Sequence, residues 1–139
     1  NAAMIFGNKL VCVSIGDGGV ILVRKGEIAL ALPDDEETVA NTTYSMCQED
    51  AYEHLKIEIY DFSDLDGVVV CTDGLINPYQ SMGNFRDKFI KPICLKIQDG
   101  KQIEIDEFIA SVGEKIGIGD DVTFGIAMKT GISLRSYRK

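Results

Sequence analysis

Three short stretches of the sequence combine an apolar run with aspartate and glycine, residue types that together can hold a metal ion. They are "VSIGDGG" (13–19), "VVCTDGL" (69–75) and "GIGDDVTF" (117–124). In the first two stretches the aspartate follows the apolar run, whereas in the third a pair of aspartates precedes one. Asp17, Asp73 and either Asp120 or Asp121 are therefore expected at one end of one β-sheet.

Each of these aspartates also has a purely structural explanation. Asp-Gly pairs are common in tight turns, because glycine tolerates a positive φ and the Asp side chain bonds to nearby backbone. Burial argues against this explanation for Asp73, since an ionised carboxylate at the mouth of an apolar strand needs a partner. Asp120 and Asp121 repel each other unless they diverge or a cation lies between them.

Carboxylates beside glycines that let the backbone approach a ligand suit a hard cation such as Mg²⁺ or Mn²⁺. Zinc is disfavoured because the chain has one histidine and no closely paired cysteines. An EF-hand calcium loop at "DLDG" (64–67) is excluded because Phe62 would occupy its first ligand position. Two Mg²⁺ or Mn²⁺ ions held by carboxylates can direct a hydroxide in line at phosphorus, which makes a phosphatase a reasonable hypothesis.

The elements that position these aspartates are predicted to be β-strands for the first part of the chain. Alternating or continuous apolar patterns predict strands at 9–15, 18–26, 27–32, 54–62, 67–73 and 122–128, and a short polar strand at 40–47. In the segment 54–62, Leu, Ile and Tyr alternate with His, Lys and Glu, which predicts a half-buried strand. Lys25-Gly26 predicts a tight hairpin turn, and residues 33–38 an acidic loop.

Two helices are predicted between the strand at 67–73 and the strand at 122–128. Residues 83–97 have helical spacing, with Pro92 expected to end or kink the helix. Residues 105–117 form the clearest helix, with Asp106 as its cap and an apolar stripe made by Phe108, Ile109, Val112 and Ile116. Hairpin-linked strands followed by segregated helices predict an α+β domain with an antiparallel sheet.

Composition limits the classes of protein that the chain can represent. Its 139 residues are enough for one domain. A net charge of −8 argues against nucleic acid or anionic lipid as the main partner. No window approaches ~18 consecutive apolar residues, so no membrane span is expected, and no signal peptide is recognised. The four dispersed cysteines are expected to be reduced and buried, which favours the cytoplasm.

The three aspartate stretches resemble, in order and spacing, motifs of the protein phosphatase 2C family, the metal-dependent serine/threonine phosphatases. "VSIGDGG" resembles the family's GDS turn, "VVCTDGL" its SDGL motif and "GDDVTF" its DD-x-T motif, so that the resemblance covers about residues 9–128. The segment 33–46 is similar to a bacterial branch of the family. The resemblance implies an antiparallel β-sandwich flanked by helices.

The resemblance also implies roles for individual residues. Asp73 and Asp120 would be ligands of a centre of two Mn²⁺ or Mg²⁺ ions, and Asp17 would contribute to a third, weaker metal site. Asp121 would support the site, and Gly74 would let the chain turn sharply beside the metal. The family's Ser-Arg after Gly-Asp is Gly18-Gly19 here, which is a departure at the third site.

The family's early motifs, which include an aspartate that bridges both metals, have no counterpart in residues 1–16. Residues 4–130 are therefore expected to be the C-terminal part of a phosphatase domain, followed by a basic tail at 131–139. The intact protein would hydrolyse phosphoserine and phosphothreonine in phosphoproteins through a metal-activated hydroxide, and this part alone would be inactive. Uncovered strand edges and apolar faces predict self-association.

Two other hypotheses stay open at this point. The chain could be a non-catalytic binding or regulatory module on a phosphatase-like scaffold, as the Gly18-Gly19 departure and the missing early motifs suggest. It could also be an unrelated acidic α+β domain whose aspartates only shape turns.

Overall fold

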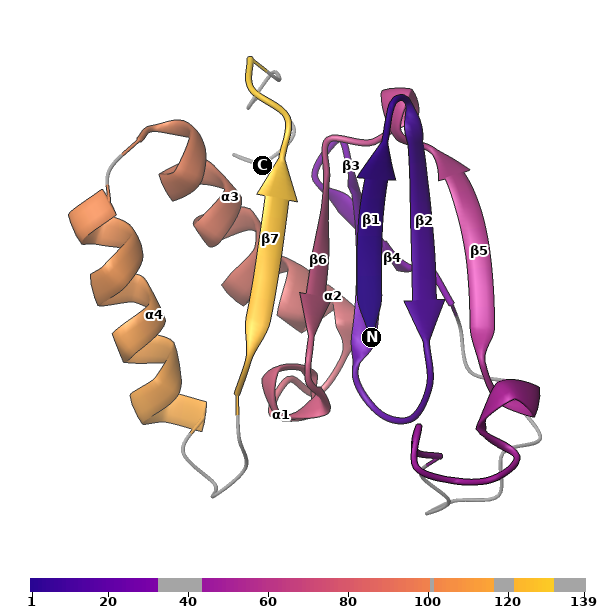
Figure 1. The fold of residues 1–139 in the computed structure, drawn as a ribbon. Coiled ribbons are helices and arrows are strands. Elements are labelled where there is room, and N and C mark those ends of the chain that lie inside the picture. Colours follow the sequence, from indigo (N-terminus) through magenta and orange to yellow (C-terminus); the bar gives the residue numbers. More distant parts are fainter. Residues whose placement is uncertain (33–43, 101, 117–121, 132–139) are drawn as a thin grey trace.

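The computed structural model describes residues 1–32, 44–100, 102–116 and 122–131 as two antiparallel sheets that face each other, with helices beyond the larger sheet (Figure 1). The smaller sheet has the order β1 (Ala2–Phe6), β2 (Lys9–Ser14), β5 (Lys56–Asp61). The larger sheet has the order β4 (Glu27–Leu30), β3 (Gly19–Arg24), β6 (Gly67–Cys71), β7 (Phe124–Met128). The predicted α+β class with an antiparallel sandwich is confirmed.

A set of short helices and one long helix covers the outer face of the four-stranded sheet (Figure 1). They are α1 (Asp73–Ile76), α2 (Met82–Phe85), the π-helical turn η3 (Arg86–Ile90), α3 (Lys91–Gln98) and α4 (Gln102–Ile116). Two 3-10 turns, η1 (Ala51–Glu53) and η2 (Phe62–Asp64), flank β5. Within the described ranges, every helix is too short or too polar to cross a membrane.

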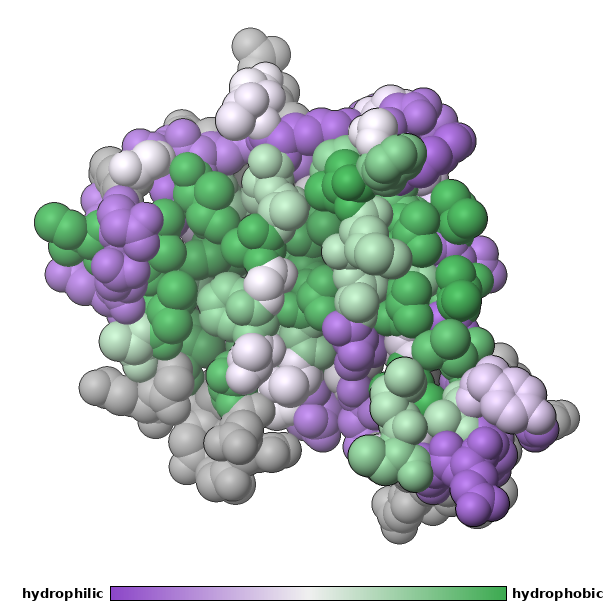
Figure 2. All heavy atoms as spheres, in the orientation of Figure 1, coloured by the Kyte–Doolittle hydropathy of each residue, from purple (hydrophilic) through white to green (hydrophobic). Residues whose placement is uncertain are grey.

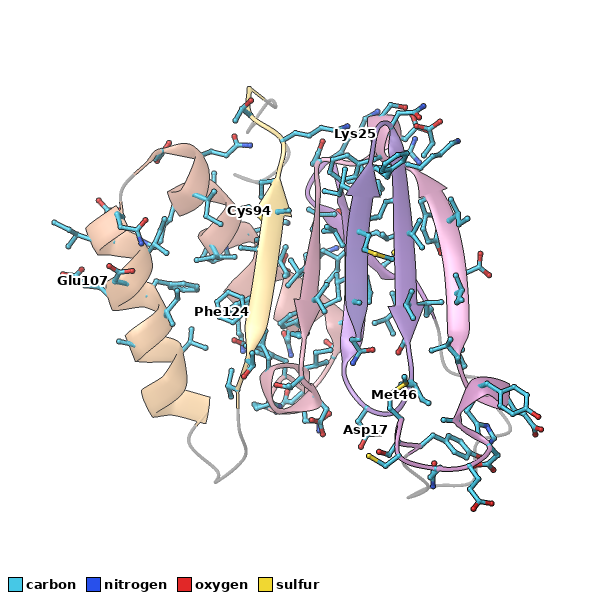
Figure 3. All side chains as sticks on the ribbon, in the orientation of Figure 1. Asp17, Lys25, Met46, Cys94, Glu107 and Phe124 are labelled. Atoms are coloured by element: carbon cyan, nitrogen blue, oxygen red, sulfur yellow. The ribbon has the colours of Figure 1, made fainter. Side chains whose placement is uncertain are left out.

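The central strands β3 and β6 are buried on both faces, which explains their continuous apolar sequences. Ile21 and Val69 are register partners and both are fully buried. Two cores lie on either side of this pair. One core fills the space between the sheets and includes Leu10, Cys12, Val20, Leu22 and Val68. The other lies under the helices, where Phe124 points from β7 toward them (Figure 3), and includes Ile21, Val69, Phe85, Phe89 and Cys94.

The outer face of the three-stranded sheet is apolar and exposed, as the right half of Figure 2 shows. Met4 and Ile59 both face Val11 across the sheet, and they are 55% and 62% exposed. Ile57 on the same face is 55% exposed. The expectation that β5 buries its isoleucines together with its tyrosine is wrong, because Tyr60 lies on the opposite face and donates a hydrogen bond to the carbonyl oxygen of Ala31.

Four details of the elements differ from the sequence-based predictions. β1 was not predicted. The described part of 40–47, residues 44–47, contains no strand. Asp106 does not cap α4, because the helix begins at Gln102, whose amide donates to the Asp106 carboxylate at 2.9 Å. Ile109 is 38% exposed rather than part of the buried stripe.

Pro92 does not end the helix. It lies in the first turn of α3, where its missing backbone N–H removes no hydrogen bond from the interior of α3. The helical run reaches Pro92 through the π-helical turn η3 and then continues to Gln98. The predicted hairpin at Lys25-Gly26 is confirmed, with φ angles of 52° and 80° between β3 and β4.

Candidate metal centre

Asp73 opens the helix α1, directly after the buried strand β6, rather than ending a strand as the sequence suggested. The intervening Thr72 is extended, and its backbone N–H donates to the carbonyl oxygen of Thr123 at 3.0 Å. The Thr72 hydroxyl in turn accepts a hydrogen bond from the Thr123 N–H at 3.1 Å. These two bonds join the end of β6 to the residue before β7. They fix the position of the backbone that leads from β6 to Asp73.

Asp17 lies in the loop that leads from β2 in one sheet to β3 in the other, not at the end of a single sheet. Gly16 and Gly18 on either side of it have positive φ angles of 71° and 99°, which glycine adopts without strain. A Cβ atom at Gly18 would lie 2.5 Å from the carbonyl oxygen of Cys71 and 3.3 Å from Cα of Thr72. Glycine therefore allows the Asp17 loop to lie directly against the backbone that carries Asp73.

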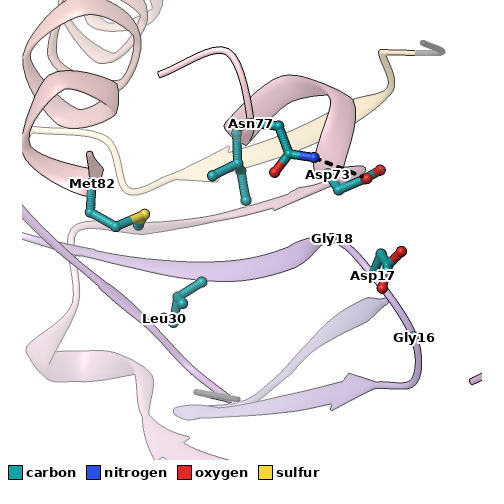
Figure 4. A pocket seen from close by; sticks show the side chains of 8 residues that line it. Gly16, Asp17, Gly18, Leu30, Asp73, Asn77 and Met82 are labelled. Carbon is teal, nitrogen blue, oxygen red and sulfur yellow. Dashed lines mark hydrogen bonds between the residues drawn. The ribbon is translucent and has the colours of Figure 1, made fainter. Parts of the chain in front are cut away.

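The consequence is that Asp17 and Asp73 line one pocket of about 290 Å³ (Figure 4). The loop that carries Asp17 and the start of α1 that carries Asp73 are more than fifty residues apart in sequence, so only the fold brings these carboxylates together. The full lining consists of Gly16, Asp17, Gly18, Leu30, Asp73, Ile76, Asn77 and Met82.

Asn77 is a site residue that the sequence reasoning missed. Its side-chain Nδ2 donates a hydrogen bond to Oδ2 of Asp73 at 3.1 Å, and its backbone N–H donates to the Asp73 carbonyl oxygen at 2.9 Å. The signal that could have revealed it is the four-residue spacing, which places two side chains on one face of a helix. The amide restrains one oxygen of the Asp73 carboxylate within the pocket.

The neighbouring thiol does not compete as a ligand. Burial raises the pKa of the Cys71 thiol to about 11, a hydrogen bond with the backbone of Gly19 opposes this shift, and the charge of Asp73 adds to it. Cys71 is buried in the core and is not among the residues that line the pocket, so its sulfur is not presented to an ion there. This leaves carboxylate and amide oxygens as the donors, a set that suits Mg²⁺ or Mn²⁺.

Among the described residues, the pocket brings together two of the predicted site residues, Asp17 and Asp73. In the part of the chain that the structure describes, no three His, Cys, Asp or Glu side chains are grouped closely enough to hold an ion. Asp120 and Asp121, which the sequence analysis assigned to the second ligand and its support, lie outside the described residues. Gly74 is buried in α1 next to Asp73, where the chain turns from strand to helix.

Comparison with known proteins gives one family and a group of solved structures. The family model described as "Protein phosphatase 2C" matches residues 1–108. Among solved structures, the serine/threonine phosphatase Stp1 from Staphylococcus aureus has a TM-score of 0.59 at 17% identity, covering 93% of this chain and 55% of its own. A bacterial serine phosphatase carrying an arginine-to-alanine substitution has a TM-score of 0.58 at 20% identity, covering 91% of this chain and 50% of its own.

At these identities the solved structures establish the fold alone. The chain spans about half the length of the structures that it matches. No curated protein matches the chain.

Proposed function

The chain belongs to the protein phosphatase 2C family, and from this premise we propose that it is part of a metal-dependent phosphatase that hydrolyses phosphoserine and phosphothreonine in proteins. The observation that carries the proposal is the pocket shared by Asp17 and Asp73. Two carboxylates that converge through a glycine contact, rather than shaping separate turns, argue against the alternative in which the aspartates are only turn residues.

In this proposal Asp73 and Asp120 bind the two ions of the catalytic centre, and Asp17 contributes to a third. Gly74 and Asp121 support the centre. When bound, Mn²⁺ or Mg²⁺ would activate the attacking water and offset the charge of the phosphoryl group. The chain's own contribution is to place the Asp73 carboxylate at the start of α1, two residues after the buried strand β6, and to hold one of its oxygens through Asn77.

A second candidate function is a non-catalytic binding module, and a specific observation favours it. The described residues contain no group of three potential ligands, and the chain covers only about half of its structural relatives. Because an incomplete centre cannot organise both ions, we propose that this chain alone is inactive and that the activity belongs to a protein with the complete domain.

The proposed partner is a phosphoprotein substrate. A net charge of −8 is unfavourable for binding nucleic acid or an anionic membrane surface, so neither is proposed as a partner. We propose a cytoplasmic location of a bacterial type, supported by four free cysteines, three of which are buried, and by the bacterial origin of the similar structures.

We also propose that the chain self-associates through the outer face of the three-stranded sheet. Met4, Ile57 and Ile59 are each more than half exposed there. The charged pair on this face, Lys9 and Asp61, is 3.5 Å apart and neutral overall. A second copy with the same net charge can therefore approach this face without meeting like charge on it.

The test is phosphopeptide hydrolysis with Mn²⁺ by the protein that carries the complete domain, comparing Asp73→Asn with the unaltered protein. Loss of a ligand charge is expected to reduce kcat/KM by at least about 100-fold. Asp99→Asn is the matched control, because Asp99 is an exposed residue at the end of α3. Unchanged hydrolysis by Asp73→Asn would exclude the proposed role of Asp73.

A further inference from the structure

The pocket beside Asp73 has two chemically different ends (Figure 4). Asp17, Asp73 and Asn77 form a polar end, whereas Leu30 and Met82 lie at the opposite, apolar end. Hard cations are bound by oxygen atoms and water, so a site for a cation alone does not require apolar side chains in its lining. The apolar end therefore needs an occupant of its own.

Side chains from three different elements form the floor of the apolar end. Leu30 comes from β4, Ile76 from α1 and Met82 from α2. All three side chains are partly buried and pack against the core under the helices. Because the floor is part of the packed core, its shape exists before any ligand arrives, which lowers the entropy cost of binding.

The buried residue Gly19 lets the side chains of Ile76 and Leu30 lie close to the backbone of β3. A Cβ atom at Gly19 would lie 3.0 Å from Cδ1 of Ile76 and 3.3 Å from Cδ2 of Leu30. Any side chain at this position would push both residues away or fill the space between them. The absence of a side chain at position 19 thus gives the pocket its apolar floor.

The size and lining of the pocket restrict what can occupy it. Its volume of about 290 Å³ lies at the lower limit for small-molecule sites, which suits one side chain rather than a helix or a strand. Leu30, Ile76 and Met82 at the apolar end give an acidic, basic or amide group no hydrogen-bond partner, so burying such a group there is unfavourable. An uncharged, apolar side chain of moderate size remains as the occupant.

We propose that this pocket binds the apolar side chain of a residue two positions from the phosphorylated residue of the substrate. The inference rests on the proposed phosphatase function and names the substrate class of the same site: phosphopeptides with leucine, isoleucine, valine or methionine two residues from the phosphoserine or phosphothreonine. Side chains of an extended peptide alternate between two faces, so a residue two positions away, about 6.6 Å along the chain, shares the face of the phosphorylated residue and reaches the apolar end when the phosphoryl group lies near Asp73.

The test measures peptide binding by NMR on this chain, with its methionine methyl groups labelled with ¹³C. The peptides differ only at the positions two residues from the phosphoserine, Leu-Ala-pSer-Ala-Leu in one and Asn-Ala-pSer-Ala-Asn in the other, and a third peptide carries Leu-Ala-Ser-Ala-Leu without phosphate. Met82 reports on the pocket, and Met128, which packs against Cys94, is the internal control. Met46 is not used as a control because it lies at the same end of the molecule as Asp17 in Figure 3.

We expect the leucine phosphopeptide to shift the Met82 methyl signal with a Kd at least about fivefold lower than that of the asparagine phosphopeptide. Met82→Gln is expected to abolish this difference in Kd, measured from backbone amide shifts, and Met82→Leu to retain it. Because Met82 is partly exposed, neither change is expected to unfold the chain, and the dispersion of the amide spectrum checks this.

Equal Kd values for the two phosphopeptides, or no shift of Met82 at peptide concentrations that saturate the other signals, would overturn the proposal. So would the absence of any binding at millimolar peptide. If the leucine peptides with and without phosphate bind equally and both shift Met82, the apolar pocket stands by itself, whereas the proposed function fails through unchanged hydrolysis by Asp73→Asn in the complete domain. The two proposals therefore fail through different results.

Discussion

The side-chain amide of Asn77 donates a hydrogen bond of 3.1 Å to Oδ2 of Asp73, four residues earlier in the chain. Both residues line the pocket to which Asp17 also contributes. The bond links Asp73, the first residue of α1, to Asn77, its C-cap residue. The short helix and the orientation of the Asp73 carboxylate therefore depend on each other. This pair provides the most direct way to alter the proposed metal site.

Replacing Asn77 with aspartate is expected to strengthen Mn²⁺ binding by about tenfold, because it adds a third carboxylate to a pocket that already contains two. Without metal, the two carboxylates at i and i+4 repel each other, so a small loss of stability is expected that Mn²⁺ reverses. Electron paramagnetic resonance of free Mn²⁺ measures the affinity. Asn84→Asp makes the same charge change outside the pocket lining, and an equal gain there would show that only bulk charge matters.

Gly18→Ala is expected to destabilise the fold more than Gly7→Ala, although both glycines have a positive φ. A Cβ at Gly7 meets no atom within 4 Å, so its cost is that of the backbone conformation, about 1–2 kcal/mol. A Cβ at Gly18 would also collide with the Cys71 carbonyl oxygen at 2.5 Å, adding about 1–3 kcal/mol. Urea unfolding measures the difference. Equal losses of stability in the two variants would mean that the loop at Gly18 is not in contact with the backbone of Cys71.

Only one of the four cysteines is expected to react rapidly with a thiol reagent in the native state. Cys47 is exposed, whereas Cys12, Cys71 and Cys94 are buried. Labelling with iodoacetamide at pH 8, followed by mass spectrometry of the peptides, identifies the residue. The same reaction in urea should label all four, and rapid native labelling of Cys12 or Cys94 would contradict the described cores.

Alkaline pH is expected to destabilise the fold through the same buried thiols. Burial raises the pKa of Cys12 to about 11 and that of Cys94 to about 12, from 9.0 in an exposed thiol. The unfolded chain releases these protons first, so their stabilising effect is complete below pH 9 and is lost as the pH rises through 11 and 12. Urea unfolding at pH 7, 9 and 10.5 should show the decline, and Cys94→Ala should make it shallower.

Ile59→Lys is expected to reduce self-association at micromolar concentration, because it places a charge among the exposed apolar side chains of the three-stranded sheet. Light scattering coupled to size-exclusion chromatography gives the mass. Ile103→Lys is the control, since Ile103 is 75% exposed on α4, away from this face. A monomeric unaltered chain would contradict the proposal directly.

Much of the secondary structure could be predicted from local patterns. The runs of β-branched residues in β2, β3 and β6 correctly indicated strands, because such side chains pack well on a pleated surface. Lys25-Gly26 indicated its hairpin because glycine at position 26 readily accepts the positive φ that a two-residue turn requires. β1 was missed although it pairs with β2 across the turn at Gly7 and Asn8, because four of its five residues are exposed and its apolar residues do not alternate with polar ones.

The sequence by itself indicated that Asp17 and Asp73 follow apolar strands and lie beside glycines, and that the chain resembles a phosphatase family. Tertiary structure alone decided that Asp17 and Asp73 share a pocket, that Asn77 holds one of them, and that Leu30, Ile76 and Met82 form its floor. It also decided that Ile57 and Ile59 face outward. The physical reason is that an alternating pattern defines two faces of a strand, while the element that covers each face is chosen by contacts distant in sequence.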